Sequence, residues 1–335
     1  MAKKRILTGV TTSGIPHLGN YVGAIRPAIL ASQENNVEAF FFLADYHSLI
    51  KIKNAAQVHE SLRAVAATWI ASGLNYEKTV FYRQSDIPEV LELNWILSTC
   101  CAKGLMNRAH AYKAATQENN SRKEDPDHGI EMGLYCYPIL MAADILAFNA
   151  DLVPVGKDQL QHLEMTRDMA ERFNKRYKKL FRLPEALIDS NIALLTGLDG
   201  RKMSKSYDNT IPLFAPEKDL RKAVMRVLTN SLRPGEKKDI KDSPLYDIYA
   251  AFASQEEKEA MAKAYAEGIA WGEVKEIVFQ KINSLLSPMR EHYEALTANP
   301  KKLDAILKQG QEKARSFTRP FLKEIKAATG LGSII

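Results

Sequence analysis

The sequence predicts an α/β protein, with a Rossmann-like parallel sheet in the first domain and an α-helical domain after it. Three observations support this. Four short apolar runs alternate with segments of helical period over the first half. After residue 207 the chain is rich in Ala, Glu and Lys and shows no strong strand pattern. The length of 335 residues exceeds that of a typical single domain.

Each expected strand is a short apolar run with the length of a buried strand. The runs are RILTGV (5–10), AFFFLAD (39–45), TVFYRQS (79–85) and DLVPV (151–155). Segments of helical period lie between and after them, over 18–32, 55–72, 88–101 and 158–176. This alternation favours parallel strands joined by crossover helices, and such sheets bind ligands at the carboxyl ends of their strands.

The second half predicts a helical bundle. The expected helical stretches are 216–229, 244–266, 271–297 and 301–328. One polar segment in the first half, TQENNSRKEDPDHG (116–129), contains Pro126 and Gly129. We expect a mobile surface loop there.

The composition is that of a packed globular protein, with 46% hydrophobic residues, a net charge of +6 and a pI near 9.0. The positive charge permits a polyanionic partner such as RNA without requiring one. The three cysteines form no CxxC pair, so neither a disulfide framework nor a four-cysteine metal site is predicted. No segment approaches the roughly 20 apolar residues of a membrane helix, and the N-terminus predicts a first strand, not a signal peptide. We therefore expect a cytoplasmic protein with no membrane partner.

The stretch TTSGIPHLGNYVGAI (11–25) places a loop of small residues between the first strand and its helix. The first N–H groups of that helix lack intrahelical partners, so an anion there gains those donors and the helix dipole. His17 and Asn20 share one face of the first turn, while Gly14 and Gly19 leave room for a ligand. A plain strand–helix turn explains this stretch equally well. The G-x-G-x-x-G pattern of dinucleotide redox cofactors is absent.

The stretch GRKMSKSYDN (200–209) lies where the α/β half ends. Its two lysines, Lys202 and Lys205, could follow negative charge as it moves onto a leaving pyrophosphate. Taken alone, this stretch is better explained as a solvated basic loop.

The combination of the two stretches is much more specific than either one. HLGN at a strand–helix junction, followed some 180 residues later by KMSKS, resembles the two signatures of class I aminoacyl-tRNA synthetases. The resemblance implies that the first signature binds ATP and that the second is a flexible loop that stabilises the transition state of adenylate formation. The implied catalytic residues are His17, Asn20, Lys202 and Lys205. The implied ATP-binding residues are Thr11, Thr12, Ser13, Gly19, Asn20, Gly156, Lys157, Asp158, Lys202, Met203, Ser204, Lys205 and Ser206.

Residues 135–174, which include YPILMAAD and VPVGKDQ, resemble the tryptophanyl-tRNA synthetases within that class, as does FYRQSDIPE (81–89). Tyr137, Met141 and Asp144 are spaced i, i+4, i+7 and form one helical stripe. An apolar wall grips a large flat ring, and a carboxylate in that wall accepts the indole N–H. Ordinary helix core is the alternative explanation of the stripe.

The expected tryptophan site combines this stripe with residues at the strand ends and after them. Its members are Leu7, Gly9, His47, Tyr137, Met141, Asp144, Val153, Val155 and Gln159. Gly9 is expected to let the substrate approach the backbone. ATP is expected as a substrate carrying Mg²⁺, with no metal bound by the protein itself.

The resemblance implies a tryptophan–tRNA ligase with L-tryptophan and tRNA(Trp) as partners, acting as a homodimer. The expected domains are 1–206 (catalytic), 207–310 (anticodon-binding) and 311–335, a C-terminal helix packing back near the catalytic domain. Residues 301–335 hold eight Lys/Arg against three Asp/Glu, which favours phosphate contacts. A tyrosyl-tRNA synthetase, a small-molecule nucleotidyltransferase and a non-catalytic RNA-binding paralogue remain as alternatives.

Overall fold

A computed structural model describes residues 3–12, 14–156, 159–187, 195–241 and 243–332. Within these ranges five parallel strands form one sheet in the order β3-β2-β1-β4-β5. The strands are β1 (Lys4–Thr11), β2 (Val37–Ala44), β3 (Val80–Arg83), β4 (Leu152–Pro154) and β5 (Glu185–Leu187). The predicted α/β class and the four predicted strands are confirmed, whereas β5 was not predicted. The strand order reverses between β1 and β4, the kind of position at which α/β sheets bind ligands.

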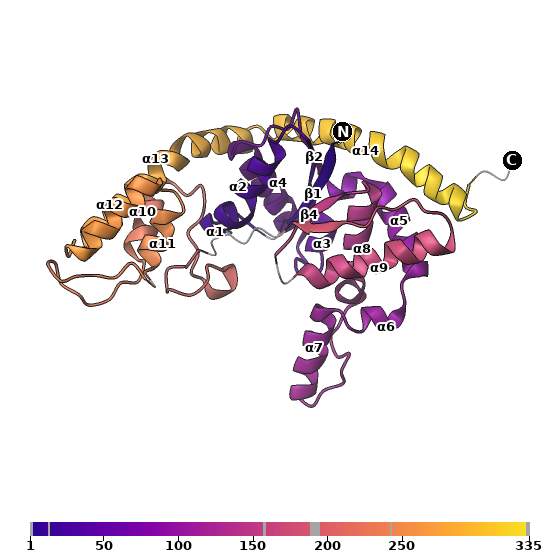
Figure 1. Ribbon diagram of the computed structural model, residues 1–335, viewed down its shortest axis with the longest axis horizontal. Helices are drawn as coiled ribbons and strands as arrows, with labels where there is room; N and C mark the ends of the chain where they lie inside the picture. Colours follow the sequence, from indigo (N-terminus) through magenta and orange to yellow (C-terminus); the bar gives the residue numbers. More distant parts are fainter. Residues whose placement is uncertain (1–2, 13, 157–158, 188–194, 242, 333–335) are drawn as a thin grey trace.

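Helices connect and cover these strands (Figure 1). In the first half they are α1 (Leu18–Asn20), a π-helical turn (Tyr21–Ile25), α2 (Arg26–Ser32), α3 (Asp45–Ser48), α4 (Ala55–Ala71), a 3₁₀ turn η2 (Gln84–Asp86), α5 (Pro88–Cys100), α6 (Lys103–Met106), α7 (His110–Ser121), α8 (Met132–Ala147) and α9 (Leu160–Arg176). The later ones are a 3₁₀ turn η4 (Lys205–Tyr207), α10 (Glu217–Met225), α11 (Pro244–Ala250), α12 (Gln255–Ala266), α13 (Trp271–Thr297) and α14 (Pro300–Ala328).

The sheet is buried on both faces, which explains why β2 is an uninterrupted apolar run. Phe41 and Leu43 belong to a core cluster with α2 and α4, and this cluster continues into the helical half of the chain. Phe40 and Phe42 belong to a second cluster with α5, α8 and α9. Successive side chains of a strand point to opposite faces, so one run serves two cores.

The first helix is less regular than its sequence predicts. Residues 18–32 form three consecutive pieces, and the middle one is a π-helical turn in which the Arg26 N–H donates to the carbonyl of Tyr21. Pro27 follows at the start of α2. Because proline has no N–H, it cannot make the regular i→i−4 bond at this point, and the helix widens before it.

The prediction of a loop over 116–129 is wrong for its first residues, because α7 extends to Ser121. The following turn folds back onto Asn119, which is buried. Its side-chain amide donates to the carbonyls of Pro126 and His128, at 3.0 and 2.8 Å. A polar segment is therefore held by one internal amide, a tertiary contact that polarity alone does not reveal.

The second half is helical, as predicted. Figure 1 shows α13 and α14 as an arch that starts at α10–α12 and passes over the sheet domain. α14 packs on β3 and α5, where Gly310 meets the backbone of Phe81 directly. Ion pairs tie the same helix to α5, including Arg315 with Glu89 at 2.8 Å and Lys326 with Glu92 at 2.9 Å. Among the described residues, no helix has both the length and the apolar character that crossing a bilayer requires.

Candidate active site

A cavity of about 540 Å³ opens at the carboxyl ends of β1, β2 and β4. All nine residues predicted for the amino-acid site line it: Leu7, Gly9, His47, Tyr137, Met141, Asp144, Val153, Val155 and Gln159. Thr11 and Gly156, from the predicted ATP site, also line it. The remaining lining residues are Phe42, Ala44, Ser48, Ile50, Lys51, Ala111, Leu134, Ile145 and Pro154. One mainly apolar pocket thus contains a few polar groups, the usual character of a small-molecule site.

Asp144 is the most buried charged group of this pocket, with 2% of its surface exposed. Its carboxylate lies 3.0 Å from Nε2 of His47 and accepts two hydrogen bonds from Nε2 of Gln84, each 2.9 Å. Burial raises the pKa of Asp144, while the bonds from His47 and Gln84 oppose that rise. The structure therefore places a well-supported acceptor in the wall of an apolar slot.

A second polar group lies on the same stripe of α8. The hydroxyl of Tyr137 is 2.7 Å from Nε2 of His162. The other ring nitrogen of His162 is 3.0 Å from Oε1 of Gln159. His162 is buried, and its two hydrogen bonds link Tyr137 to Gln159, which both line the cavity. The helical stripe predicted from Tyr137, Met141 and Asp144 is real, and it faces the cavity.

Gly9 lines the cavity, and packing gives this position a further reason to be glycine. A Cβ at Gly9 would come within 2.4 Å of the Phe42 ring, its register partner on β2. A larger residue would displace the Phe42 ring, so packing between neighbouring strands favours glycine, in addition to any approach of a ligand to the backbone.

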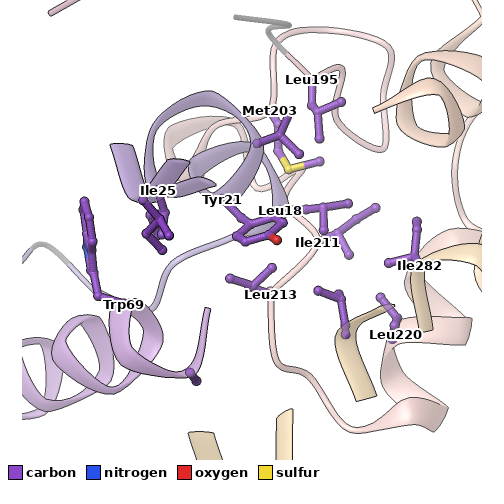
Figure 2. Packing of buried hydrophobic residues seen from close by; sticks show 14 of the residues in the cluster. Leu18, Tyr21, Ile25, Trp69, Leu195, Met203, Ile211, Leu213, Leu220 and Ile282 are labelled. Carbon is purple, nitrogen blue, oxygen red and sulfur yellow. The ribbon is translucent and has the colours of Figure 1, made fainter. Parts of the chain in front are cut away.

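The two signature stretches meet in space although some 180 residues separate them. The N–H of Gly19 points at Sδ of Met203, at 3.3 Å, and the N–H of Leu18 donates to the carbonyl of Ile211 at 2.8 Å. Figure 2 shows Leu18 and Tyr21 packed with Met203, Ile211 and Leu213. Met203 is thus a buried contact between the two stretches, while its neighbours are exposed or partly exposed.

His17 begins this first helix. The backbone N–H of His17 donates to Oδ1 of Asn20 at 3.0 Å, which fixes the two predicted residues against each other. Burial lowers the pKa of His17 to about 4, and the nearby Lys205 ammonium adds to that effect. Its Nδ1 has no hydrogen-bond partner within the described ranges. A neutral imidazole with one nitrogen available for a hydrogen bond therefore lies at the start of α1.

Lys205 lies at the small-residue loop, since a Cβ on Gly14 would be 3.2 Å from its Nζ. Its side chain is exposed, yet the surrounding protein lowers its pKa by desolvation. The loop that carries it is organised by the buried Asn209. This side chain accepts from the N–H of Ser204 and donates to Asp199 and to the carbonyl of Lys202. Ser204 and Ser206 hydrogen-bond each other, at 2.8 Å.

Not every predicted residue reaches the cavity or the loop junction. Thr12 is fully buried, and its hydroxyl lies 2.8 Å from that of Ser48, so it supports the strand end from behind. Ser13, Lys157 and Asp158 lie outside the described residues. In the described part of the chain, no three His, Cys, Asp or Glu side chains converge in a way that could hold a metal ion.

Comparison with known proteins agrees with this geometry. Residues 2–287 match the family described as tRNA synthetases class I (W and Y). The tryptophan–tRNA ligase of Neisseria meningitidis serogroup A is 58% identical over 332 residues, which cover 99% of each chain. The chain belongs to the tryptophanyl-tRNA synthetase family.

Two further relatives show how far the similarity extends. The tryptophan–tRNA ligase of Pseudomonas aeruginosa is 55% identical over 333 residues, covering 98% of this chain and 74% of that protein. The crystal structure of the Campylobacter jejuni tryptophanyl-tRNA synthetase, complexed with ADP and tryptophan, superposes with a TM-score of 0.89. It is 36% identical, covering 98% of this chain and all of that one. The family resemblance inferred from the sequence is confirmed.

Sequence reasoning about this family member missed three residues that shape the site: Gln84, His162 and Asn209. Gln84 directly follows β3, so the rule that ligands bind at strand carboxyl ends could have identified it. His162 lies three residues after Gln159, and this spacing indicates that the two side chains lie on one face of the helix. Asn209 is the last residue of the basic stretch, and nothing in the local sequence marks it as buried.

Proposed function

We propose that the chain condenses L-tryptophan with ATP to tryptophanyl-adenylate and pyrophosphate, and then transfers the tryptophanyl group to tRNA(Trp), releasing AMP. The observation that carries this proposal is the buried Asp144 carboxylate in the wall of an otherwise apolar cavity. Indole has one polar atom, an N–H donor, and a fixed carboxylate is its natural acceptor. A substrate without that donor would leave one acceptor position of a buried carboxylate unsatisfied, and sites built for a hydrogen bond reject such a substrate by roughly 10⁴–10⁵-fold.

The rest of the cavity suits the remainder of the amino acid. Met141, Val153 and Val155 provide apolar surface for the ring. The family resemblance assigns the amino group of the substrate to Gln159, which also lines the cavity. Tyrosine is the closest competitor because its hydroxyl also donates. It is excluded by reach, since a phenol and an indole present their donors at different distances from the α-carbon.

The adenylation step requires no covalent enzyme intermediate, because the substrate carboxylate itself attacks the α-phosphorus and pyrophosphate leaves. Catalysis then consists of positioning and charge stabilisation. The start of α1, with His17 and Asn20, faces the phosphate chain, and Lys202 and Lys205 stabilise the charge that develops on the leaving group. Since His17 is neutral at pH 7, it acts as a hydrogen-bonding group and adds no positive charge. Mg²⁺, where present, would be carried by the triphosphate and would offset part of its charge.

We propose that the chain acts as a homodimer in the cytoplasm. The helical half of one subunit would bind the anticodon of a tRNA that spans both subunits. We propose residues 1–206 as the catalytic domain, 207–310 as the anticodon-binding domain and 311–335 as the segment that returns to the catalytic domain, beginning within α14. Of the eight basic residues after position 300, Lys313, Arg315, Arg319 and Lys326 contact other parts of this chain. Phosphate contacts are therefore better sought on Lys301, Lys302, Lys308 and Lys323.

Amino-acid-dependent ATP–pyrophosphate exchange, measured with each of the twenty amino acids, tests the proposal. Tryptophan should support exchange, and tRNA should be charged with tryptophan only. Exchange with tyrosine instead would identify a tyrosyl enzyme. No exchange with any amino acid, with tRNA binding retained, would identify a non-catalytic RNA-binding protein.

A further inference from the structure

Gln84 lies directly behind the wall of the cavity and is completely buried, with 0% of its surface exposed. Its amide nitrogen is 2.9 Å from each oxygen of Asp144. Its amide oxygen accepts from the backbone N–H of Tyr46 at 3.1 Å. A backbone N–H can only donate, so this contact fixes which end of the amide faces the carboxylate. The NH₂ group must point to Asp144.

The hydrogen-bond capacity of the carboxylate shows what this contact does. Two oxygens offer about four lone-pair positions. His47 bonds to Oδ2 alone, which would leave the carboxylate plane free to turn. Gln84 spans both oxygens and fixes that plane. These three contacts leave capacity for one more donor, on Oδ1, and Asp144 lines the cavity.

We propose that Gln84 is a positioning residue for substrate selection, and that preference for an amino acid with a ring N–H depends on its orientation of the Asp144 carboxylate. This inference rests on the proposed function and adds a residue that does not touch the substrate.

Few of the groups around Asp144 donate a hydrogen bond to it. His47 and Asp45 face it from α3, and Tyr82 faces it from β3. The Asp45 carboxylate adds to the rise in the pKa of Asp144. Burial raises the pKa of Tyr82 well above its ordinary value, so its hydroxyl stays neutral. That hydroxyl has no hydrogen-bond partner in the part of the chain that the structure describes. Only His47 and Gln84 therefore support the ionised carboxylate by hydrogen bonds within these described surroundings.

The backbone around Gln84 is held from the outside. Arg83 pairs with Asp86 across the same short turn, at 2.7 Å. Gln311 on α14 donates from its side chain to the carbonyl of Asp86, at 3.2 Å. Gln311 is thus a glutamine that supports the same segment without contacting the carboxylate, which makes it a matched control.

The test compares the full-length wild type with Gln84→Met, a change of similar volume that removes both donors. ATP–pyrophosphate exchange is measured with tryptophan and with β-(3-benzothienyl)alanine, in which sulfur replaces the ring N–H. Loss of hydrogen bonds to a charged group is expected to lower kcat/KM for tryptophan roughly 10- to 100-fold. The value for the sulfur analogue should change little, so the tryptophan preference falls by the same factor. Gln311→Met should keep the wild-type preference.

Two results would overturn the inference, and they differ from each other. Equal losses for both substrates in Gln84→Met, with the preference unchanged, would mean that Gln84 only supports the fold. A wild-type preference near one would mean that no ring N–H is read at all, which overturns the proposed role of Asp144 as well.

A second variant keeps the test decisive where Gln84→Met fails to fold. Gln84→Glu has nearly the same shape but places two carboxyl groups in contact, so one of them holds a proton. As pH rises, that proton is lost and two facing charges repel. The expected result is a fall in kcat/KM for tryptophan between about pH 6 and about pH 9 that the wild type does not show. A profile parallel to that of the wild type contradicts the inference.

Discussion

Replacing Gly310 by alanine tests how the C-terminal helix is seated on the sheet. A Cβ at this position would lie 1.6 Å from the carbonyl oxygen of Phe81 and 2.6 Å from its carbonyl carbon. Both are backbone atoms of β3, so no side chain can rotate to make room. α14 would have to move away from the sheet by more than an ångström.

The expected loss of stability follows from two opposing terms. Alanine in the middle of a helix gains about 1 kcal/mol over glycine, through backbone entropy. Overpacking a close contact costs about 1–3 kcal/mol, and more where backbone must shift. Displacement would also strain the pair between Arg315 and Glu89, whose carboxylate is buried. We expect Gly310→Ala to lower the free energy of unfolding by about 2 kcal/mol net.

The assay is urea unfolding of the full chain, followed by circular dichroism. Gly272→Ala in α13 is the matched control, because an added Cβ there meets nothing within 4 Å. It should leave stability unchanged or raise it by up to about 1 kcal/mol. A Gly310→Ala variant as stable as Gly272→Ala would refute the close seating of α14 on β3.

Three further predictions concern the site. Lys205→Met should slow adenylate formation roughly 10²–10³-fold, because one donor to the transition state is lost. Tryptophan affinity, measured by equilibrium binding, should be nearly unchanged. An unchanged maximal rate of pyrophosphate exchange would contradict a role of Lys205 in the transition state. His17 has a folded pKa of about 4 against an ordinary 6.5, so the unfolded chain binds more protons between these values. The contribution of the neutral His17 to the free energy of unfolding is present above about pH 6.5 and is lost as pH falls towards 4. In acid unfolding, the free energy of unfolding of His17→Phe should therefore fall less than that of the wild type over this pH range. Asp144→Asn should reduce kcat/KM for tryptophan at least 10-fold while the KM for ATP stays constant, and a parallel rise in both KM values would indicate general damage to the fold.

The sequence predicted those parts of the fold in which local pattern and tertiary structure agree. The apolar run of β2 supplies both faces of the sheet, and the stripe on α8 faces the cavity as its spacing requires. β5 has only the residues Glu185–Leu187 and no apolar run. It becomes a strand because it pairs with β4, which is a tertiary effect.

The same limit applies to the site. Residues 11–25 and 200–209 were informative because their combination is rare, even though each stretch alone has a simple explanation. Gln84 and Asn209 are single polar residues whose partners lie on other elements, so no local period marks them. The helix over 116–121 was not predicted, because the contacts that bury Asn119 come from the turn that follows and leave no local pattern.

The central claim is that Asp144 accepts the ring N–H of the substrate. A crystal structure of this chain with bound tryptophan measures it directly. We expect the indole nitrogen about 2.7–3.2 Å from a carboxylate oxygen of Asp144, with Gln84 still bonded to both oxygens. An indole nitrogen turned away from Asp144, or bonded to another group, would contradict the account.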